Sequence, residues 1–217
     1  MPCRNHYRTL VKHQVVTKSN EPVIIESLRL ITELVIWGDQ HNAAIFQVFL
    51  EHKMLDVFSG ILAQPTSTAV KRQLIQSVMM MVQNLSREDS LFYLLSHAAV
   101  AEVIVFPFDF KDEEELVAYY VSFLKTLSLR LDRTSIQFFF DGESLPLFSR
   151  ALGFINSPEG MVRTSMRTLA LNVLRVDDDN LRKFIADRSA VLFSLYDALV
   201  DRKSYKLGDG EDDLVGQ

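Results

Sequence analysis

The residue types that most often carry catalysis or bind metals are present in this sequence, but they are not grouped into a site. No two histidines lie four residues apart, as a pair of histidine metal ligands on one helix face would; the five are His6, His13, His41, His52 and His97. The acidic runs 113–115 and 177–179 are expected at helix N-termini, where negative charge complements the helix dipole. No phosphate-binding loop, dinucleotide-binding glycine pattern, serine-hydrolase elbow or zinc-protease motif occurs. The sequence therefore predicts no enzyme activity, no cofactor and no bound metal.

Polar side chains that can bind another protein are spread over several predicted helices. Projection onto helical wheels selects as candidate partner-binding residues Arg29, Gln76, Tyr119, Ser122, Arg163 and Arg167. The polar residues that project with them are Glu26, Glu33, Gln73, Asn84 and Glu115. Arg163 and Arg167 lie one helical turn apart, so their two guanidinium groups can meet a carboxylate of a partner. An intramolecular ion pair with Glu159 or Asp177 is the alternative.

Composition limits the classes of partner. The chain has 217 residues, of which 48% are hydrophobic, enough for a continuous core. Its net charge of -5 gives no basic field for a phosphate backbone, so nucleic acid is not expected as a partner. A single cysteine, Cys3, excludes a disulfide framework. No apolar run approaches the ~18 residues of a membrane span, so the protein is expected to be soluble or held at membranes peripherally.

Residues 1–19 are expected to form a basic N-terminal helix or arm. Arg4, Arg8 and Lys12 recur every four residues, and no acidic residue precedes Glu21. The residues that can share the opposite side are Tyr7, Leu10, Val11 and Val15. This helix packs on the next helix or touches a membrane surface; both readings are open at this point.

A repeat organises the rest of the chain. Amphipathic runs begin near Val23, Ala69, Leu116 and Val162, at intervals of 46, 47 and 46 residues. Pairs of adjacent large aromatic or aliphatic residues recur with a similar period at 49–50, 94–95, 138–139 and 184–185. A third series follows in each repeat, at 54–58, 100–104, 145–148 and 191–195. A period of ~40–47 residues is typical of armadillo and HEAT proteins. The predicted fold is therefore all-α, an armadillo/HEAT-like right-handed solenoid of about four helical repeats.

The predicted repeats span residues 20–65, 66–110, 111–156 and 157–205, and an acidic, flexible tail spans 206–217. In the first repeat we expect a helix over Val23–Trp37, capped by Asn20, with Pro22 in its first turn and Gly38 at its end. Its apolar stripe comprises Ile24, Leu28, Ile31 and Val35. Trp37 is expected to be packed where the chain turns at Gly38.

Several segments resemble the FPL domain. They include 15–17, 26–29, Ile36–His41, 90–96 and Phe108–Phe110, followed by Tyr119–Ser128 and the stretch from Met161 to Val173. Together they cover about residues 15–176 in one collinear order. The resemblance is to the family that contains the animal endosomal maturation protein, C-type lectin domain family 16 member A and a plant Golgi and vacuolar trafficking protein.

The resemblance implies a non-catalytic interaction scaffold in endosome or Golgi-to-lysosome (vacuole) traffic and autophagy. It also implies a cytoplasmic location, peripheral to endosome, Golgi or lysosome membranes. Implied partners are vacuolar-sorting and tethering components or a ubiquitin ligase. The alternative function is a regulatory or substrate-binding part of a ubiquitin ligase assembly in mitophagy. A lectin activity is not expected, because Cys3 alone cannot form the disulfides of a secreted lectin.

Overall fold

The computed structural model describes residues 2–13, 15–111 and 113–187, and these residues form helices and loops without any strand. The all-α prediction is confirmed. The helices are α1 (Pro2–Lys12), α2 (Glu21–His41), α3 (Ala43–Glu51), α4 (Met54–Leu62), α5 (Thr68–Asn84), α6 (Glu88–Ser96), α7 (Ala98–Val105), α8 (Glu114–Ser128), η1 (Ser135–Phe138), α9 (Pro146–Phe154), α10 (Gly160–Leu174) and α11 (Asp179–Ala186). The predicted tail and the last segment of the third predicted series, at 191–195, lie outside the described residues.

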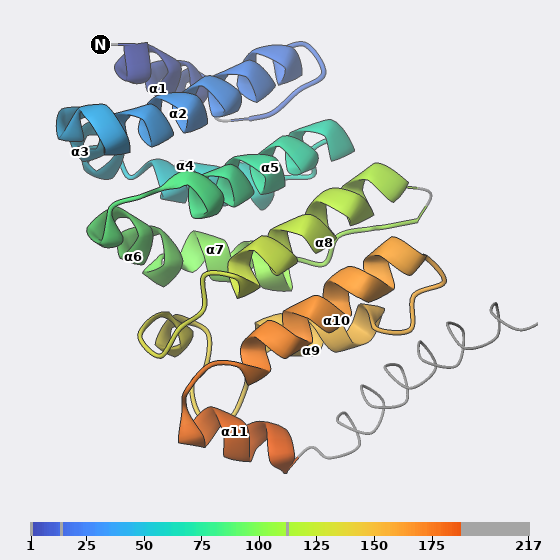
Figure 1. The fold of residues 1–217 in the computed structure, drawn as a ribbon. Coiled ribbons are helices and arrows are strands. Elements are labelled where there is room, and N and C mark those ends of the chain that lie inside the picture. The colour runs from blue at the N-terminus through green and yellow to red at the C-terminus, as the bar shows by residue number, and fades with distance from the viewer. Residues whose placement is uncertain (1, 14, 112, 188–217) are drawn as a thin grey trace, which may run out of the picture. The chain divides into compact units, whose positions relative to one another are not determined.

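The described residues divide into two parts, one up to Val176 and one from Asp177 to Asp187, and each is described by itself. In the first part the long helices α2, α5, α8 and α10, called the row helices below, lie side by side in sequence order (Figure 1). The shorter helices α4, α7 and α9 contact one another in the same order behind the row. Helix α1 lies within the predicted N-terminal segment 1–19 and packs mainly on α2.

The core of the row repeats with a constant interval of 46 residues. Five positions are buried in all four row helices: Ile24, Val70, Leu116 and Val162; Leu28, Leu74, Tyr120 and Met166; Ile31, Ser77, Phe123 and Leu169; Thr32, Val78, Leu124 and Ala170; Val35, Met81, Leu127 and Val173. The predicted stripe of the first repeat belongs to this set. Because equivalent positions are buried, each row helix turns the same side toward its neighbours in the row and toward the shorter helices behind it.

Polar contacts between neighbouring row segments have almost the same period. The Thr68 hydroxyl donates to the Glu113 carboxylate at 2.9 Å, across 45 residues of sequence. The Asn172 amide donates to the Ser128 hydroxyl at 3.0 Å, across 44 residues. Arg72 forms an ion pair with Glu115. These bonds link α5 to α8 and α8 to α10, and hold these helices in register.

The end of α2 differs from the prediction. The helix does not stop at Gly38 but continues to His41, where the Asn42 amide donates to the Gly38 carbonyl at 2.8 Å. Gly38 is instead buried against α3, and a β-carbon there would lie 2.6 Å from the Ile45 β-carbon. Asn20 occupies the N-cap position but its side chain does not cap the helix. Pro22 lies in the first turn, as predicted.

Gly38 and Gly60 allow a test with opposite expected signs. Gly38→Ala should lower the free energy of unfolding by about 1–3 kcal/mol, because the new methyl group overlaps Ile45. Gly60→Ala, within α4, should raise it by roughly 0.5–1 kcal/mol, because no atom lies within 4 Å of the place that its methyl group would occupy and alanine favours the helix. Urea unfolding measures both. Equal signs for the two variants would contradict the close approach of α2 and α3.

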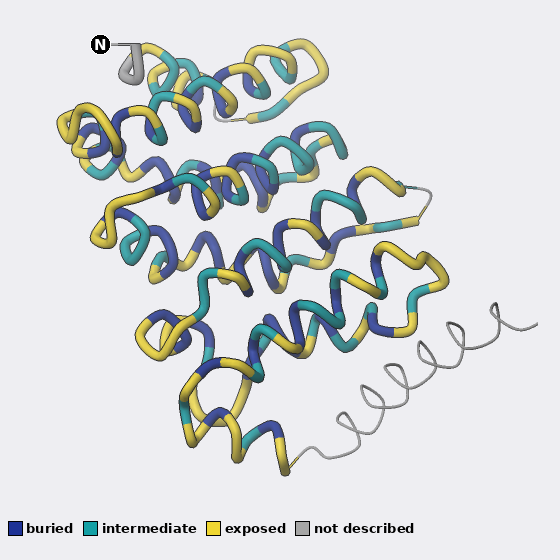
Figure 2. Tube along the Cα trace, in the orientation of Figure 1, coloured by how far each residue is buried: buried dark blue, intermediate teal, exposed yellow. Residues whose placement is uncertain are grey.

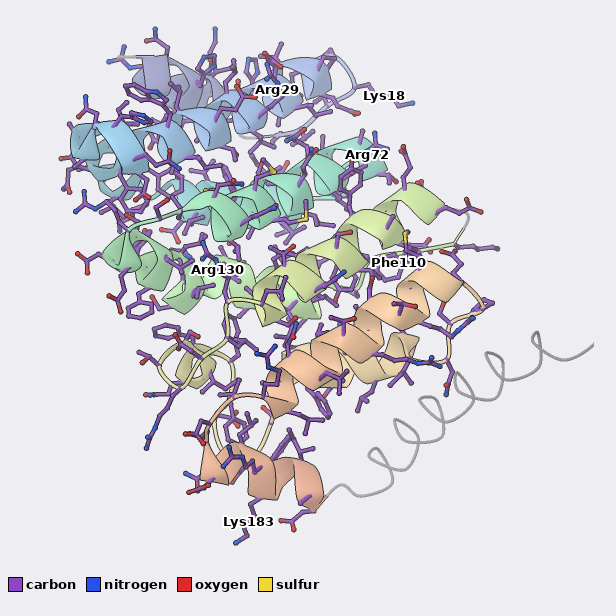
Figure 3. All side chains as sticks on the ribbon, viewed as in Figure 1. Lys18, Arg29, Arg72, Phe110, Arg130 and Lys183 are labelled. Carbon is purple, nitrogen blue, oxygen red and sulfur yellow. The ribbon has the colours of Figure 1, made fainter. Side chains whose placement is uncertain are left out.

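An aromatic cluster anchors the loop between α7 and α8. Phe106 and Phe108 have ring centroids 4.7 Å apart, and Phe108 and Phe110 each lie 5.3 Å from the Tyr120 ring. Phe110, labelled in Figure 3, also meets Phe154 of α9 at 5.7 Å. The alternating phenylalanines thus pack one side of the loop against α8 and α9, which gives this part of the chain a structural role.

Burial raises the pKa of Tyr120 to about 12, and its hydroxyl donates to the Ile104 carbonyl. Since the folded pKa exceeds the unfolded value of ~10, this tyrosine stabilises the fold fully below that value, and the contribution is lost as pH rises toward 12. Tyr120→Phe should therefore make the unfolding free energy less dependent on pH in this window. Urea unfolding at several alkaline pH values measures it. An identical loss in both proteins would contradict the assignment.

Candidate interaction surface

The outward side of the row helices repeats as regularly as the core. Among the positions that are half-buried or exposed in every row helix at the interval of 46 residues, four follow the helical spacing i, i+3, i+4 and i+7, and together they are called the row face. The row face comprises Leu30, Glu33, Leu34 and Trp37 of α2; Gln76, Met79, Met80 and Gln83 of α5; Ser122, Lys125, Thr126 and Leu129 at α8; Thr168, Leu171, Asn172 and Arg175 at α10. Figure 2 shows exposed and intermediate residues along the near side of these helices. One continuous surface therefore extends over four helices.

Large apolar side chains stand on this surface without cover. Trp37 is 51% exposed and Leu129 is 63% exposed, and both occupy the same position of the repeat. Met80 and Leu171 are exposed as well. Tryptophan and methionine are enriched in protein interfaces, where they provide large contact areas. Trp37 and Met80 lie at the α2 and α5 end of the row face. Leu129 and Leu171 lie at the α8 and α10 end, together with the cations Lys125 and Arg175.

Trp37 is not packed in the core, so the prediction for this residue is wrong. Because α2 continues through Gly38, Trp37 stays on the outward side of a regular helix. Its ring stacks on the His41 ring with centroids 4.9 Å apart and an interplanar angle of 10°. The His41 Nδ1 atom lies 2.9 Å from the Trp37 carbonyl oxygen. The stack orients the indole while leaving one of its faces open.

Trp37 is the only tryptophan, so its fluorescence reports directly on this surface. We expect red-shifted emission from the native protein, because the indole is half exposed, and a blue shift when a partner covers the row face. Titration with iodide as a quencher checks the first expectation. Native emission as blue as that of a buried indole would contradict the placement of Trp37.

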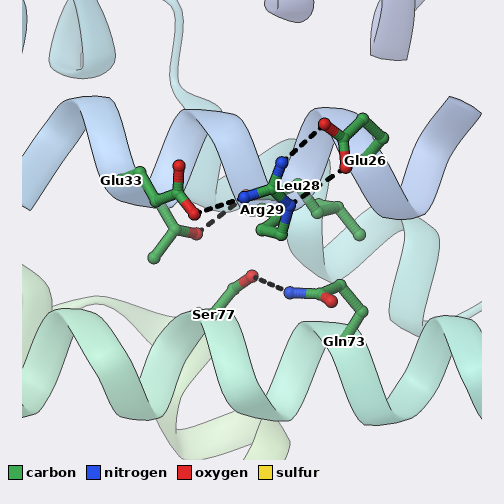
Figure 4. Close-up of polar contacts among 7 residues, drawn as sticks. Glu26, Leu28, Arg29, Glu33, Gln73 and Ser77 are labelled. Carbon is green, nitrogen blue, oxygen red and sulfur yellow. Dashed lines mark hydrogen bonds and ion pairs between the residues drawn. The ribbon is translucent and has the colours of Figure 1, made fainter.

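Arg29 is held within its own helix. Its guanidinium group donates to Glu26 at 2.6 and 3.0 Å and to Glu33 at 2.5 Å (Figure 4). The hydrogen bond from Arg29 lowers the pKa of Glu26, and the two carboxylates raise the pKa of Arg29. All three side chains are exposed, so this network adds little to stability. With two carboxylates and one guanidinium group, the network leaves one net negative charge on the exposed side of α2.

Only some of the predicted binding residues lie on the row face. Gln76 and Ser122 lie on the row face at equivalent positions, 46 residues apart. Arg29 and Arg167 also share a position of the repeat, but the residues there in α5 and α8 are buried, so this position is not part of the row face. Tyr119 is half-buried beside the row face.

Arg163 already has intramolecular partners. Its guanidinium group donates to the carbonyl oxygens of Ser157 and Pro158, both at 2.6 Å, and so fixes the loop before α10. Neither predicted carboxylate partner takes part: Asp177 pairs with Arg182 at 2.7 Å. Arg167 is half-buried, and its buried Nε atom has no hydrogen-bond partner among the residues that the structure describes.

The remaining polar residues proposed from the wheels have intramolecular bonds. The Gln73 amide donates to the Ser77 hydroxyl at 3.3 Å (Figure 4), and the Asn84 amide donates to the Met80 carbonyl at 2.8 Å. Glu115 is paired with Arg72. The apolar residues Trp37, Met80, Leu129 and Leu171 were not selected from the sequence, although the repeat interval, applied position by position, would have aligned Trp37 with Leu129.

A hollow of about 560 Å³ at the end of α2 contains the residue types of a hydrolase triad. The aspartate, histidine and serine side chains of this hollow form hydrogen bonds with backbone groups and not with one another. Asp39 accepts the backbone amides of Ser86 and Arg87 at 2.7 and 3.1 Å, which caps the start of α6. His41 contacts the Trp37 carbonyl, and the Ser86 hydroxyl donates to the Asn84 carbonyl. These three side chains therefore do not form a nucleophile and base pair.

Among the described residues, no three histidine, cysteine, aspartate or glutamate side chains come together in a way that could hold a metal ion. None of the described helices has the length and apolar character needed to cross a membrane.

Comparison with known proteins identifies the family. The FPL family model, described as an uncharacterised conserved protein, matches residues 28–174. Protein CLEC16A of Homo sapiens is 43% identical over 189 residues, which cover 85% of this chain and 18% of the human protein. The Drosophila melanogaster CLEC16A homolog is 43% identical over 188 residues, with the same coverage.

Protein TRANSPARENT TESTA 9 of Arabidopsis thaliana is 36% identical over 181 residues, which cover 81% of this chain and 22% of the plant protein. This chain thus spans about a fifth of the length of these curated relatives. The resemblance inferred from the sequence motifs is confirmed, and the chain belongs to the FPL family.

Proposed function

We propose that this chain is a non-catalytic interaction scaffold that binds another protein through the row face. The observation that carries the proposal is the repetition of four outward positions over α2, α5, α8 and α10, with Trp37 and Leu129 exposed in equivalent places. Exposed apolar side chains that recur along one face of a folded protein are suited to a binding site. We further propose that the fold is an armadillo-type solenoid, which the constant interval of the buried positions supports.

Endosome or Golgi-to-lysosome traffic and autophagy are the processes we propose for this scaffold. Membership of the FPL family supports this, because the family resemblance associates the domain with that traffic. In this proposal the protein acts in the cytoplasm at the surface of endosomes, Golgi or lysosomes. Its partners are vacuolar-sorting or tethering components, with a ubiquitin ligase assembly as the alternative. Since the relatives are much longer, activities of their other regions are not assigned to this chain.

The proposal is tested by proximity labelling in cells with three proteins: the full chain, the variant Trp37→Ser, and the control Val105→Ser. Val105 is a similarly exposed apolar residue, but it lies at the end of α7 behind the row. We expect endolysosomal tethering proteins among the labelled partners, a roughly tenfold loss with Trp37→Ser, and no change with the control. Equal labelling by all three proteins would contradict the role of the row face.

A ubiquitination assay separates the scaffold from the enzyme alternative. The chain is incubated with ubiquitin and with its activating and conjugating enzymes. No ubiquitin chains are expected, because no cysteine and histidine cluster of the kind that recruits conjugating enzymes through zinc is present in the sequence. Formation of chains by this protein alone would overturn the non-catalytic assignment.

A further inference from the structure

A second exposed surface lies on α1 and the turn that follows it, away from the row face. It consists of Arg8, Val11, Lys12, Val15 and Lys18, and is called the basic ledge. Val15 is 68% exposed and Val11 is 37% exposed, so two apolar side chains stand among three cations. No acidic residue occurs in the first 20 residues of the sequence.

The packing of α1 determines which side is free. Leu10 is 2% exposed and faces the neighbouring helices, and the Tyr7 ring stacks on the His52 ring with centroids 4.2 Å apart. Residues 8, 11 and 12 follow one another at helical spacing on the other side. The contacts of α1 with α2, α3 and α4 therefore leave Arg8, Val11 and Lys12 toward solvent.

The turn after α1 holds Val15 outward by specific hydrogen bonds. The Asn20 amide donates to the Val15 carbonyl at 2.9 Å, and the Asn20 Oδ1 atom accepts the Thr17 amide at 2.8 Å. The Val16 amide donates to the Gln64 side chain at 2.9 Å, which ties the turn to the end of α4. The exposed valine is thus fixed in place beside Lys18, which points away from the ribbon in Figure 3.

The three cations of the basic ledge have no ion-pair partner among the described residues, in contrast to Arg29 and Arg72. We propose that the basic ledge docks the protein on an anionic phospholipid surface, with Val11 and Val15 entering the headgroup region and the cations meeting lipid phosphates. Cations beside exposed apolar residues on an amphipathic helix are suited to such a surface. The proposal rests on α1 and its turn alone and is independent of the proposed role of the row face.

Vesicle co-sedimentation of the full chain tests the proposal. The vesicles are pure phosphatidylcholine or phosphatidylcholine with one-fifth phosphatidylserine. We expect binding to the anionic vesicles only, and weaker binding as salt is added. Arg8→Glu with Lys12→Glu should reduce the partition coefficient by at least roughly fivefold for each cation removed. Val15→Ser should reduce it as well.

The matched control is Arg133→Glu with Lys111→Glu, which changes the net charge equally at two exposed cations outside the basic ledge. The control should bind like the unmodified protein, and the melting temperatures of all variants should agree. Equal loss in the control, or no effect of Val15→Ser, would overturn the proposal. Unchanged vesicle binding of the Arg8→Glu and Lys12→Glu variant would also overturn the proposal. If that variant bound vesicles normally but lost a protein partner, the basic ledge would be assigned to an acidic protein.

Discussion

Replacement of Arg130 by alanine is expected to lower the free energy of unfolding by about 3 kcal/mol. The Arg130 side chain, labelled in Figure 3, donates to three carbonyl oxygens at the end of α5: Val82 at 2.8 Å, Gln83 at 3.3 Å and Leu85 at 2.7 Å. The last carbonyls of a helix have no partner within the helix and carry its negative dipole end. Without the guanidinium group, part-buried acceptors lose their partner and one link between α5 and the end of α8 is broken.

Two variants isolate this effect in urea unfolding measurements. Arg130→Lys should restore only part of the stability, because a single ammonium group cannot reach all three acceptors as the planar guanidinium group does. Arg175→Ala is the matched control. Like Arg130, Arg175 comes directly after a leucine at the C-terminal end of a row helix, but its side chain is exposed. Its replacement should change the free energy by less than roughly 0.5 kcal/mol. Equal losses for Arg130→Ala and Arg175→Ala would contradict the capping role.

The repeat was predictable from sequence because buried positions impose a strict pattern. Ile24, Val70, Leu116 and Val162 begin the apolar runs that the sequence revealed, and the row helices begin within a few residues of the predicted starts. The end of α2 was not predictable. A glycine after an amphipathic run usually marks a helix end, but Gly38 is required by the close passage of Ile45, a contact that only the packed chain reveals.

The exposed surface was predicted only in part, for a related reason. Helical wheels identify polar residues on the outward side of a helix, among them Gln76 and Ser122. They do not identify Trp37, because a tryptophan is expected in the core by its residue type. Hydrophobic residues are not excluded from surfaces, and an exposed one carries information only after the buried set is known.

The bonds of the arginines were equally inaccessible from the sequence. Arg163 and Arg130 donate to backbone carbonyls, which no residue pattern identifies. The carboxylate partners predicted for Arg163 therefore differ from the carbonyl oxygens that it binds.

Replacement of Phe123 by alanine is expected to have the largest effect, a loss of about 3–5 kcal/mol in the free energy of unfolding. Phe123 is fully buried at the middle of α8, which packs on both α5 and α10. The cavity left by the ring weakens both contacts at once. Such a loss is a large part of the ~5–15 kcal/mol that stabilises a typical domain.

The shape of the Phe123→Ala unfolding curve carries further information. The main contacts of the row join each helix to its neighbours, so a weakened α8 should uncouple the helices before it from α10. We expect urea unfolding of the variant to broaden, with a lower m-value, whereas Phe138→Ala, at a partly exposed ring in η1, should shift the curve slightly at constant slope. A single transition of unchanged slope in Phe123→Ala would mean that the row unfolds as one cooperative body, and that contacts beyond nearest neighbours hold it together.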